Sequence, residues 1–257
     1  MRIVEPRVYL IAKTELVPGA LELYLKETFG IDWTSDAESD AEKLVEANGR
    51  MCYRSWKPAL NPNVTKIREN HKEYIENILR SKHGSVLEHS MATFYFVNVS
   101  RVFTHELVRH RAGVAISQES LRYVRLNDIG MWIPSCFRDD PNMVVMIQTL
   151  VSGLEEVQTA LASKYGLDDG KDFATKKEIT SAMRRLAPDG LATTIAWSAN
   201  FRALRHVIEM RTALGAEEEI RIVFDKVAEI AKTNWPAVFQ DFSRNEDGEW
   251  KPEYSKV

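Results

Sequence analysis

Arginine is concentrated in two short stretches of this chain, and neither stretch contains lysine. Residues 101–125 hold five arginines and two glutamates, a local charge of +3, and residues 200–211 hold three arginines and one glutamate, a local charge of +2. A planar guanidinium binds two oxygens of a phosphate or carboxylate at once. A single arginine is more simply explained as the complement of a helix C-terminal dipole, but two clusters together predict anionic ligands.

The first cluster continues into residues 116–125, which we predict to be extended. Side chains alternate along a strand, so Gln118, Ser120 and Arg122 would share one face. An amide, a hydroxyl and a guanidinium could together hold a nucleobase edge and a phosphate. A solvent-facing polar stripe on an edge strand explains the same pattern equally well, and the residues alone do not separate the two interpretations.

The second cluster lies on a predicted helix. Arg202 and His206 are neighbours at a spacing of four, and Asn200 and Arg211 return to nearly the same face. At about 1.5 Å per residue, the last two lie ~16 Å apart along the axis. One small phosphate cannot contact both, so the ligand is long, or several ligands or subunits share the helix.

Patterns of nucleophilic or metal catalysis are weak in this sequence. His105 and Glu106 are followed by His110, one residue too far along to place both histidines on one helical face as a zinc protease does. A metal-dependent hydrolase built on these three residues is therefore a minor alternative. The two cysteines, Cys52 and Cys136, are too few for a disulfide framework. A protein rich in Arg, Gln, Asn and His, without an evident nucleophile, suits an enzyme whose cofactor carries the difficult chemistry.

The composition is that of an ordinary folded soluble protein and argues against a general polynucleotide binder. The 257 residues include 34 Lys+Arg and 37 Asp+Glu, so the net charge is −3. General nucleic-acid binding needs a basic surplus. We find neither a transmembrane-length apolar run nor a secretory leader, and we expect a cytoplasmic protein with no membrane or nucleic-acid partner.

Hydrophobic periodicity predicts an α/β (α+β) fold, a single domain with a central mixed or antiparallel sheet flanked by long helices. The domain is expected over residues 1–243, followed by a polar, mobile tail at 244–257. The predicted strands are 7–12, 91–98, 116–125 and 191–198. The predicted helices include 39–53, 62–82, 101–110, 141–166, 201–214, 216–232 and a short one at 235–243. Asp140 and Pro141 form an N-cap and first-turn proline.

Three separated motifs resemble those of the flavin-dependent thymidylate synthases. Arg109-His110-Arg111 is followed by the run Ser117–Tyr123 (SQESLRY), which resembles the RHR…S motif of that family. Leu87-Glu88-His89 precedes it, and Asn200-Phe201-Arg202 with His206 and Arg211 comes after it, in the family's order. The resemblance covers roughly residues 80 to 222.

The family implies a homotetramer with FAD and dUMP bound at subunit interfaces. It implies reductive methylation of dUMP to dTMP, with 5,10-methylenetetrahydrofolate as the carbon donor. Reduced FAD supplies the hydride and NADPH re-reduces the flavin. The resemblance also implies the flavin contacts. They are Arg109, His110, Arg111, Gln118, Asn200, Arg202 and His206.

The resemblance further implies the residues that hold dUMP, with Arg184 reaching the phosphate across an interface. They are Glu106, Leu107, Val108, Arg109, Gln118, Glu119, Ser120, Leu121, Arg122, Arg184 and Arg211. Catalytic roles are expected for Arg211, for Ser120 beside the uracil, and for His89 near the flavin. A fixed cation such as Arg211 beside N3 stabilises an anionic uracil, which makes C5 a better nucleophile.

The chain departs from the family at three places. Eight residues, Ala112 to Glu119, separate the RHR motif from the family's serine where seven are usual, and we place the extra residue within 112–115. Gly215 and Met91 occupy positions where many members have polar residues. The alternative from another class is a non-enzymatic nucleotide- or RNA-binding module that uses the same arginines.

Overall fold

The chain folds into two compact units whose segments alternate along the sequence. The computed structural model describes residues 1–255 and 257. Unit 1 comprises Met1–Tyr9, Tyr95–His110 and Ile116–Trp197, and unit 2 comprises Leu10–Phe94, Arg111–Ala115 and Ser198–Val257. Neither unit is a continuous stretch of sequence, so the two are not consecutive domains. The single domain expected over residues 1–243 stays a prediction.

A four-stranded sheet with the order β2-β3-β6-β4 carries the fold. Its strands are β2 (Arg7–Lys13), β3 (Met91–Ser100), β6 (Ala192–Asn200) and β4 (Val114–Gln118). Alternate side chains of β3 and β6 are buried, including those of Phe94, Phe96 and Trp197, as period-two patterning requires. The predicted mixed fold of strands and long helices is confirmed.

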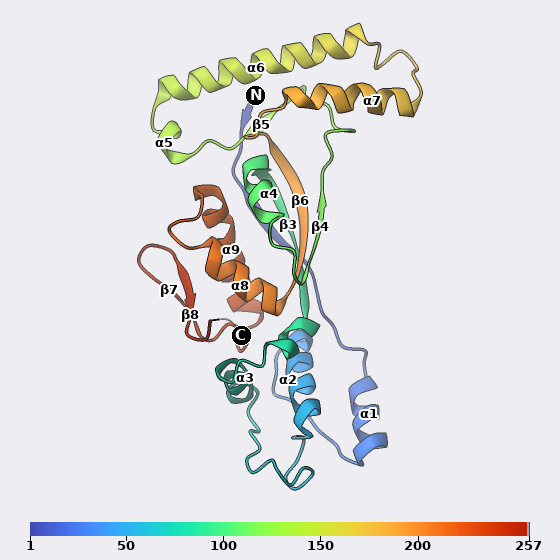
Figure 1. Ribbon diagram of the computed structural model, residues 1–257, viewed down its shortest axis with the longest axis vertical. Helices are drawn as coiled ribbons and strands as arrows, with labels where there is room; N and C mark the ends of the chain where they lie inside the picture. The colour runs from blue at the N-terminus through green and yellow to red at the C-terminus, as the bar shows by residue number, and fades with distance from the viewer. Residues whose placement is uncertain (256) are drawn as a thin grey trace. The chain divides into compact units, whose positions relative to one another are not determined.

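Unit 1 contains the helices that follow β3 and precede β6 in the sequence (Figure 1). They are α4 (Arg101–Leu107), α5 (Ser135–Arg138), α6 (Pro141–Lys164), α7 (Phe173–Met183) and the 3-10 turn η2 (Arg184–Leu186). Near the chain start, β1 (Arg2–Ile3) pairs in parallel with β5 (Gly130–Met131). The Asp140 side chain accepts hydrogen bonds from the first amides of α6 and Pro141 opens the helix, as predicted.

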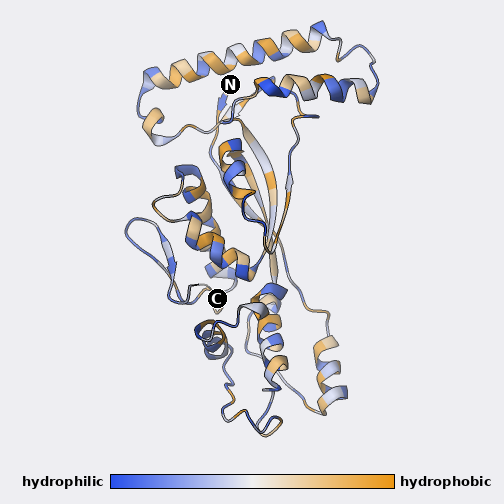
Figure 2. Cartoon of the chain, viewed as in Figure 1, coloured by the Kyte–Doolittle hydropathy of each residue, from blue (hydrophilic) through white to orange (hydrophobic). Residues whose placement is uncertain are grey.

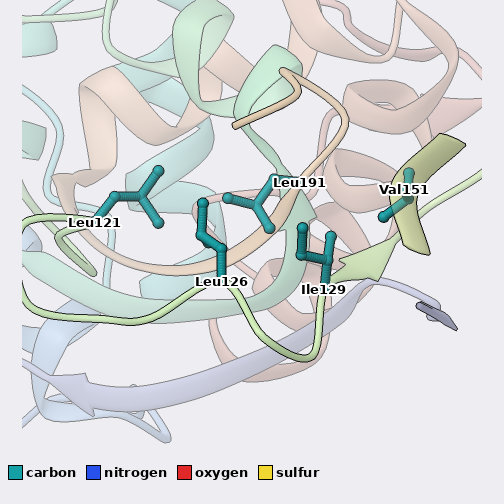
Figure 3. Packing of buried hydrophobic residues seen from close by; sticks show 5 residues of the cluster. All are labelled: Leu121, Leu126, Ile129, Val151 and Leu191. Atoms are coloured by element: carbon teal, nitrogen blue, oxygen red, sulfur yellow. The ribbon is translucent and has the colours of Figure 1, made fainter. Parts of the chain in front are cut away.

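A small apolar cluster attaches α6 to the rest of unit 1 (Figure 3). Val151 from α6 packs with Leu191, which precedes β6, and with three side chains from the loop after β4: Leu121, Leu126 and Ile129. The Met1 amino group, 2.9 Å from a Glu155 carboxylate oxygen, adds a charged contact on the same helix. One face of α6 is therefore held inward.

Unit 2 contains the remaining helices and a C-terminal hairpin. They are α1 (Ala20–Phe29), α2 (Asp40–Tyr53), α3 (His71–Arg80), the 3-10 turn η1 (Gly84–His89), α8 (Phe201–Arg211), α9 (Glu218–Asn234), β7 (Phe242–Arg244) and β8 (Trp250–Pro252). Ser39 caps α2 by accepting a hydrogen bond from the Glu42 amide. Buried Glu46 joins α2 to α3, because its carboxylate binds both Arg50 and His71 Nδ1.

Three predicted elements differ from the structure by more than a helical turn. The helix predicted at 62–82 covers only His71–Arg80, because the Asn70 side chain caps it by accepting from the Glu73 amide. The strand predicted at 116–125 ends at Gln118, where a turn begins. Residues 235–243 form no α-helix, and their C-terminal end enters β7.

The segment at 244–257, for which the sequence predicts a mobile tail, forms much of the β7–β8 hairpin within its described residues. Trp250 is buried, and its indole nitrogen donates to Asp225 of α9 at 2.8 Å. Arg205 of α8 forms a buried ion pair with Asp241 at 2.7 Å and also donates to the Tyr254 carbonyl. Local polarity does not show these long-range partners, and the mobility of this segment stays a prediction.

Within the described part of the chain, no helix has both the length and the apolar character needed to cross a membrane.

The hairpin gives a pH prediction. Hydrogen bonds from Lys251, from the Leu214 amide and from Asn245 lower the pKa of the Glu249 carboxyl from its ordinary value of 4.5 to about 2. A depressed acid pKa stabilises the folded state fully above pH 4.5, and this contribution is lost as the pH falls toward 2. We expect Glu249→Gln to lower the free energy of unfolding near pH 7 and to matter progressively less below pH 4.5. Denaturant unfolding of both proteins from pH 7 to pH 3 measures this, and a constant difference across that range would contradict it.

Candidate active site

In unit 1, the first arginine cluster begins where β3 runs directly into α4. Ser100 caps the helix by accepting from the Phe103 amide at 3.0 Å. The next residue, Arg101, opens α4; its own amide donates to the Leu191 carbonyl and its guanidinium donates to the Glu119 carbonyl. The start of α4 is therefore fixed both to the segment before β6 and to the segment after β4.

Arg101 lacks a full set of partners. Burial, and then the charge of Arg184, lower the pKa of its guanidinium, and only Glu119 and Asp189 oppose this. Its Nε atom is buried with no hydrogen-bond partner among the described residues. A partly buried cation with a buried, unsatisfied donor beside a second cation is costly without an anion. Sequence reasoning counted Arg101 in the cluster but gave it no role; its position at the first turn of a helix was the available signal.

The predicted dUMP segment is a turn rather than a continuing strand. The Gln118 amide donates to the Thr104 hydroxyl at 3.3 Å, which ties the end of β4 to α4. The Ser120 hydroxyl accepts from the Arg122 amide, and the Tyr123 and Val124 amides donate to the Ser120 carbonyl. The alternation that would place Gln118, Ser120 and Arg122 on one strand face therefore ends at Gln118.

The turn places the other members of this segment in different surroundings. Leu121 is buried in the apolar cluster with Val151, so its side chain serves the core. The Glu119 carboxylate accepts from the Thr194 amide of β6, and the Glu119 amide donates to the Thr194 carbonyl. The Nε atom of Arg122 is buried without a partner in the described residues, like that of Arg101.

The RHR motif lies in a turn after α4. The helix ends at Leu107, three residues earlier than predicted, and Leu107 is fully buried. Val108 and Arg109 are exposed, and the His110 amide donates to the Leu107 carbonyl. Because His110 lies beyond the helix, it does not share a helical face with His105, which removes the geometric basis of the zinc-hydrolase alternative.

In unit 2, β6 runs directly into α8 in the same manner. The Asn200 side chain caps α8 by accepting from the Ala203 amide at 2.8 Å, and the Asn200 amide donates to the Gly113 carbonyl at 2.9 Å. Gly113 has a φ of +69°, and a Cβ atom there would lie 2.5 Å from the Asn200 side-chain nitrogen. Only glycine satisfies both constraints. The hydrogen bond from Asn200 holds Gly113, and with it the segment 112–115, against the start of α8.

The arginines of α8 have two different environments. Arg202 Nη1 donates to Glu88 at 2.5 Å and Nε donates to the Val257 carbonyl, while the side chain stays half exposed. His206, one turn later, is also exposed, as the spacing predicts. Arg205 is buried against Asp241 and is structural, so the +2 cluster offers fewer ligand-binding cations than its count indicates.

The remaining predicted residues of unit 2 surround the start of α8 or lie on it. His89 is exposed at the end of η1, and the adjacent Ser90 carbonyl accepts from the Phe201 amide of α8 at 2.9 Å. Arg111 is exposed, and Arg211 is half-buried in the last turn of α8. The described residues contain no group of three His, Cys, Asp or Glu side chains that could hold a metal ion.

The structure thus divides the predicted site residues between the two units. In unit 1, Arg101, Gln118 and Glu119 are linked around α4, with the charge of Arg184 acting on Arg101. In unit 2, Asn200 and Arg202 are linked to the 113 segment and to η1. Each set presents guanidinium groups from the beginning of a capped helix, which is an arrangement suited to anions.

Comparisons with known proteins identify the family. The family described as thymidylate synthase complementing protein matches residues 34–237. A flavin-dependent thymidylate synthase of Mycobacteroides abscessus is 35% identical over 253 residues, covering 93% of this chain and 91% of the relative. One of Corynebacterium diphtheriae is 36% identical over 219 residues, covering 83% of this chain and 84% of that one.

Solved structures support the fold. Thymidylate synthase X of Helicobacter pylori, crystallised with FAD and dUMP, has a TM-score of 0.55 at 21% identity, covering 78% of this chain and 93% of that one. The UMP/dUMP methylase PolB of Streptomyces cacaoi, bound with 5-Br dUMP, has a TM-score of 0.57 at 18% identity, covering 93% and 95%. With the family match across most of its length, this chain belongs to the flavin-dependent thymidylate synthase family.

Proposed function

We propose that this protein methylates dUMP to dTMP, with FAD as the hydride carrier, NADPH as the reductant and 5,10-methylenetetrahydrofolate as the carbon donor. The observation that carries the proposal is the unsatisfied guanidinium of Arg101 beside Arg184. A nucleotide phosphate would supply both the missing acceptor and the missing negative charge. The runner-up, a non-enzymatic nucleotide- or RNA-binding module, would use the same cations but requires no flavin.

In this proposal the nucleotide binds around α4 and the turn that follows β4. Arg101, Arg122 and the Arg184 beside Arg101 supply phosphate donors. The family resemblance adds that Arg184 also reaches the phosphate bound to a neighbouring subunit. Gln118 and Ser120 present an amide and a hydroxyl to the base. Of the other contacts that the resemblance implies, Leu121 and Leu107 have buried side chains, so they contribute through their backbone groups.

The residues of unit 2 fit a flavin nucleotide. The exposed part of the α8 face presents Arg202 and His206, and the Asn200 cap orders its first turn. The diphosphate of FAD is an anion that such a helix start favours. Arg109, His110 and Arg111 are proposed as further flavin contacts. Bound FAD would supply hydride transfer, which no side chain of this protein can perform.

Arg211 is proposed to hold the uracil. A guanidinium beside N3 and the neighbouring carbonyl stabilises the uracil as an anion, which raises the electron density at C5, where the new carbon bond forms. His89 and Ser120 are proposed to position flavin and uracil. The homotetramer and the cytoplasmic location are parts of the same proposal and follow the family resemblance.

An absorption spectrum tests the proposal. We expect the purified protein to be yellow, with a flavin absorption band at about 450 nm. If it is purified without flavin, we expect the same band after FAD is added and the unbound excess is removed by gel filtration. We also expect NADPH oxidation that depends on dUMP. A colourless protein that retains no added FAD would contradict the proposal, and steep salt-dependent polynucleotide binding without flavin would favour the runner-up.

Arg101 gives a second prediction. Because its buried Nε atom lacks an acceptor and the charge of Arg184 lies beside it, we expect dUMP to raise the melting temperature of the wild-type protein more than that of Arg101→Gln. A ligand at about 100 times its Kd adds about 2.7 kcal/mol, so the loss is measurable by thermal unfolding. Arg185→Gln is the matched control, since it removes the same charge from the residue next to Arg184. An equal dUMP response in all three proteins would exclude a phosphate role for Arg101.

Arg211 gives a third. We expect Arg211→Ala to lose most methyl transfer, by roughly 100-fold or more, because a fixed charge that stabilises the reacting anion is typically worth that much. The flavin band should remain, since the change removes a uracil contact. Loss of flavin with normal turnover of dUMP after FAD is restored would contradict the role.

A further inference from the structure

The outward face of α6 is apolar although the helix is already held inward. Val151, Gln158 and Ala162 point into unit 1 and are buried. On the opposite face Met146 and Leu150 are 64% and 66% exposed. Solvent-exposed aliphatic side chains of this size, gathered on one helix, mark an interaction surface.

The exposed residues of this face, together with the half-buried Gly153, follow a coiled-coil spacing. Met146, Leu150, Gly153, Val157 and Ala160 are separated by four, three, four and three residues. This alternation places small or apolar side chains in one seam along the helix. Figure 2 shows apolar residues recurring along α6 between polar ones. The seam is therefore patterned to pack against another helix.

Gly153 lies at the middle of α6, which runs from Pro141 to Lys164. A Cβ atom there would meet nothing within 4 Å, so the fold of the single chain does not require glycine at this position. Glycine also weakens the interior of a helix. A close approach by a second helix at the centre of α6 explains why a residue without a side chain stands there.

We propose that the α6 seam, defined as Met146, Leu150, Gly153, Val157 and Ala160, packs against the same seam of a second copy of this chain. The two helices run antiparallel, with Gly153 of each copy on a two-fold axis. A seam that is centred on one residue is self-complementary under a two-fold rotation. Met146 then packs against Ala160 of the second copy, and Leu150 against Val157.

The charges of α6 fit this antiparallel pair. Asp140 caps the N-terminal end and Lys164 ends the helix, so the acidic end of α6 in one copy lies level with the basic end of α6 in the second copy. The helix dipoles also oppose one another. Glu156, at the edge of the seam, faces Thr149 of the second copy rather than another acid. A parallel pair would instead place equal charges together at each end.

A second copy fits this face better than a lipid surface does. Helices that lie on membranes carry several lysines or arginines beside their apolar stripe, whereas the only basic residue of α6 is Lys164. The inference deepens the assembly part of the proposed function and names the surface that part uses. Its tests measure mass and cross-linking, so they fail or succeed separately from the flavin chemistry.

Leu150→Arg tests the interface. In the pair, this change places a charge against Val157 of the second copy, and we expect the apparent dissociation constant to rise at least about tenfold. Sedimentation or light scattering across a dilution series measures the assembly. Leu23→Arg is the matched control, since Leu23 is also exposed but lies on α1. A wild-type protein that is monomeric, or a Leu150→Arg protein whose assembly equals that of the wild type and of the control, would overturn the proposal.

Disulfide cross-linking tests the direction of the pair. The exposed Cys52 and Cys136 are first replaced by serine. A disulfide needs Cα atoms within about 7 Å, so Gly153→Cys should link to itself on oxidation. Met146→Cys should link to Ala160→Cys in a mixture of the two proteins and only weakly to itself. Efficient self-linking of Met146→Cys would indicate a parallel pair, and no linking by Gly153→Cys would indicate no crossing there; either result overturns the proposal.

Discussion

Two junctions, where a strand continues into a helix with no intervening loop, fix the side chains on which the chemistry of this protein depends. β3 ends at Ser100 and Arg101 opens α4; β6 ends at Asn200 and Arg202 lies in the first turn of α8. In both, a polar side chain of the last strand residue caps the helix, an interaction usually worth about 1 kcal/mol. Its larger effect is on position, because each arginine starts from backbone held at one end by a sheet and at the other by helical hydrogen bonds.

The arginines of this protein fall into two groups: some form buried ion pairs with a carboxylate, and others do not. Arg50 and Arg205 are buried against Glu46 and Asp241, and they join helices to distant segments. For Glu46, hydrogen bonds from His71 and Ser35 and the charge of Arg50 overcome the opposing effect of burial and lower the pKa of its carboxyl. Such pairs neutralise themselves. Arg101 forms no comparable ion pair with a carboxylate in the described residues. An almost neutral chain can therefore still have a local positive potential that favours binding of an anion.

The sequence was most informative where local physics decides the outcome. The cap and proline at Asp140 and Pro141, the period-two strand after Ser90, and the spacing of Arg202 and His206 were all readable from neighbouring residues. It was least informative where distant partners decide. Nothing local distinguishes Arg205, bound to Asp241, from Arg202 on the open face, or shows that Trp250 has a place beside α9. The site residues were identified by family resemblance, and the turn at Ser120 that rearranges them depends on contacts across unit 1.

The alternation of the two units along the chain has a consequence for how the protein is made. β1, at residues 2–3, has no partner until β5 at residues 130–131 exists, and the helix that carries Arg202 follows a strand that is not reached until residue 192. A chain emerging from the ribosome therefore cannot complete either unit until about three-quarters of it has been synthesised. Pairings between such distant residues are slow to form, because the loops they close are long. The early strands and helices therefore remain without their long-range partners during much of synthesis. Because each unit combines segments from separate parts of the sequence, neither unit can be isolated by truncating the chain or by expressing one continuous fragment.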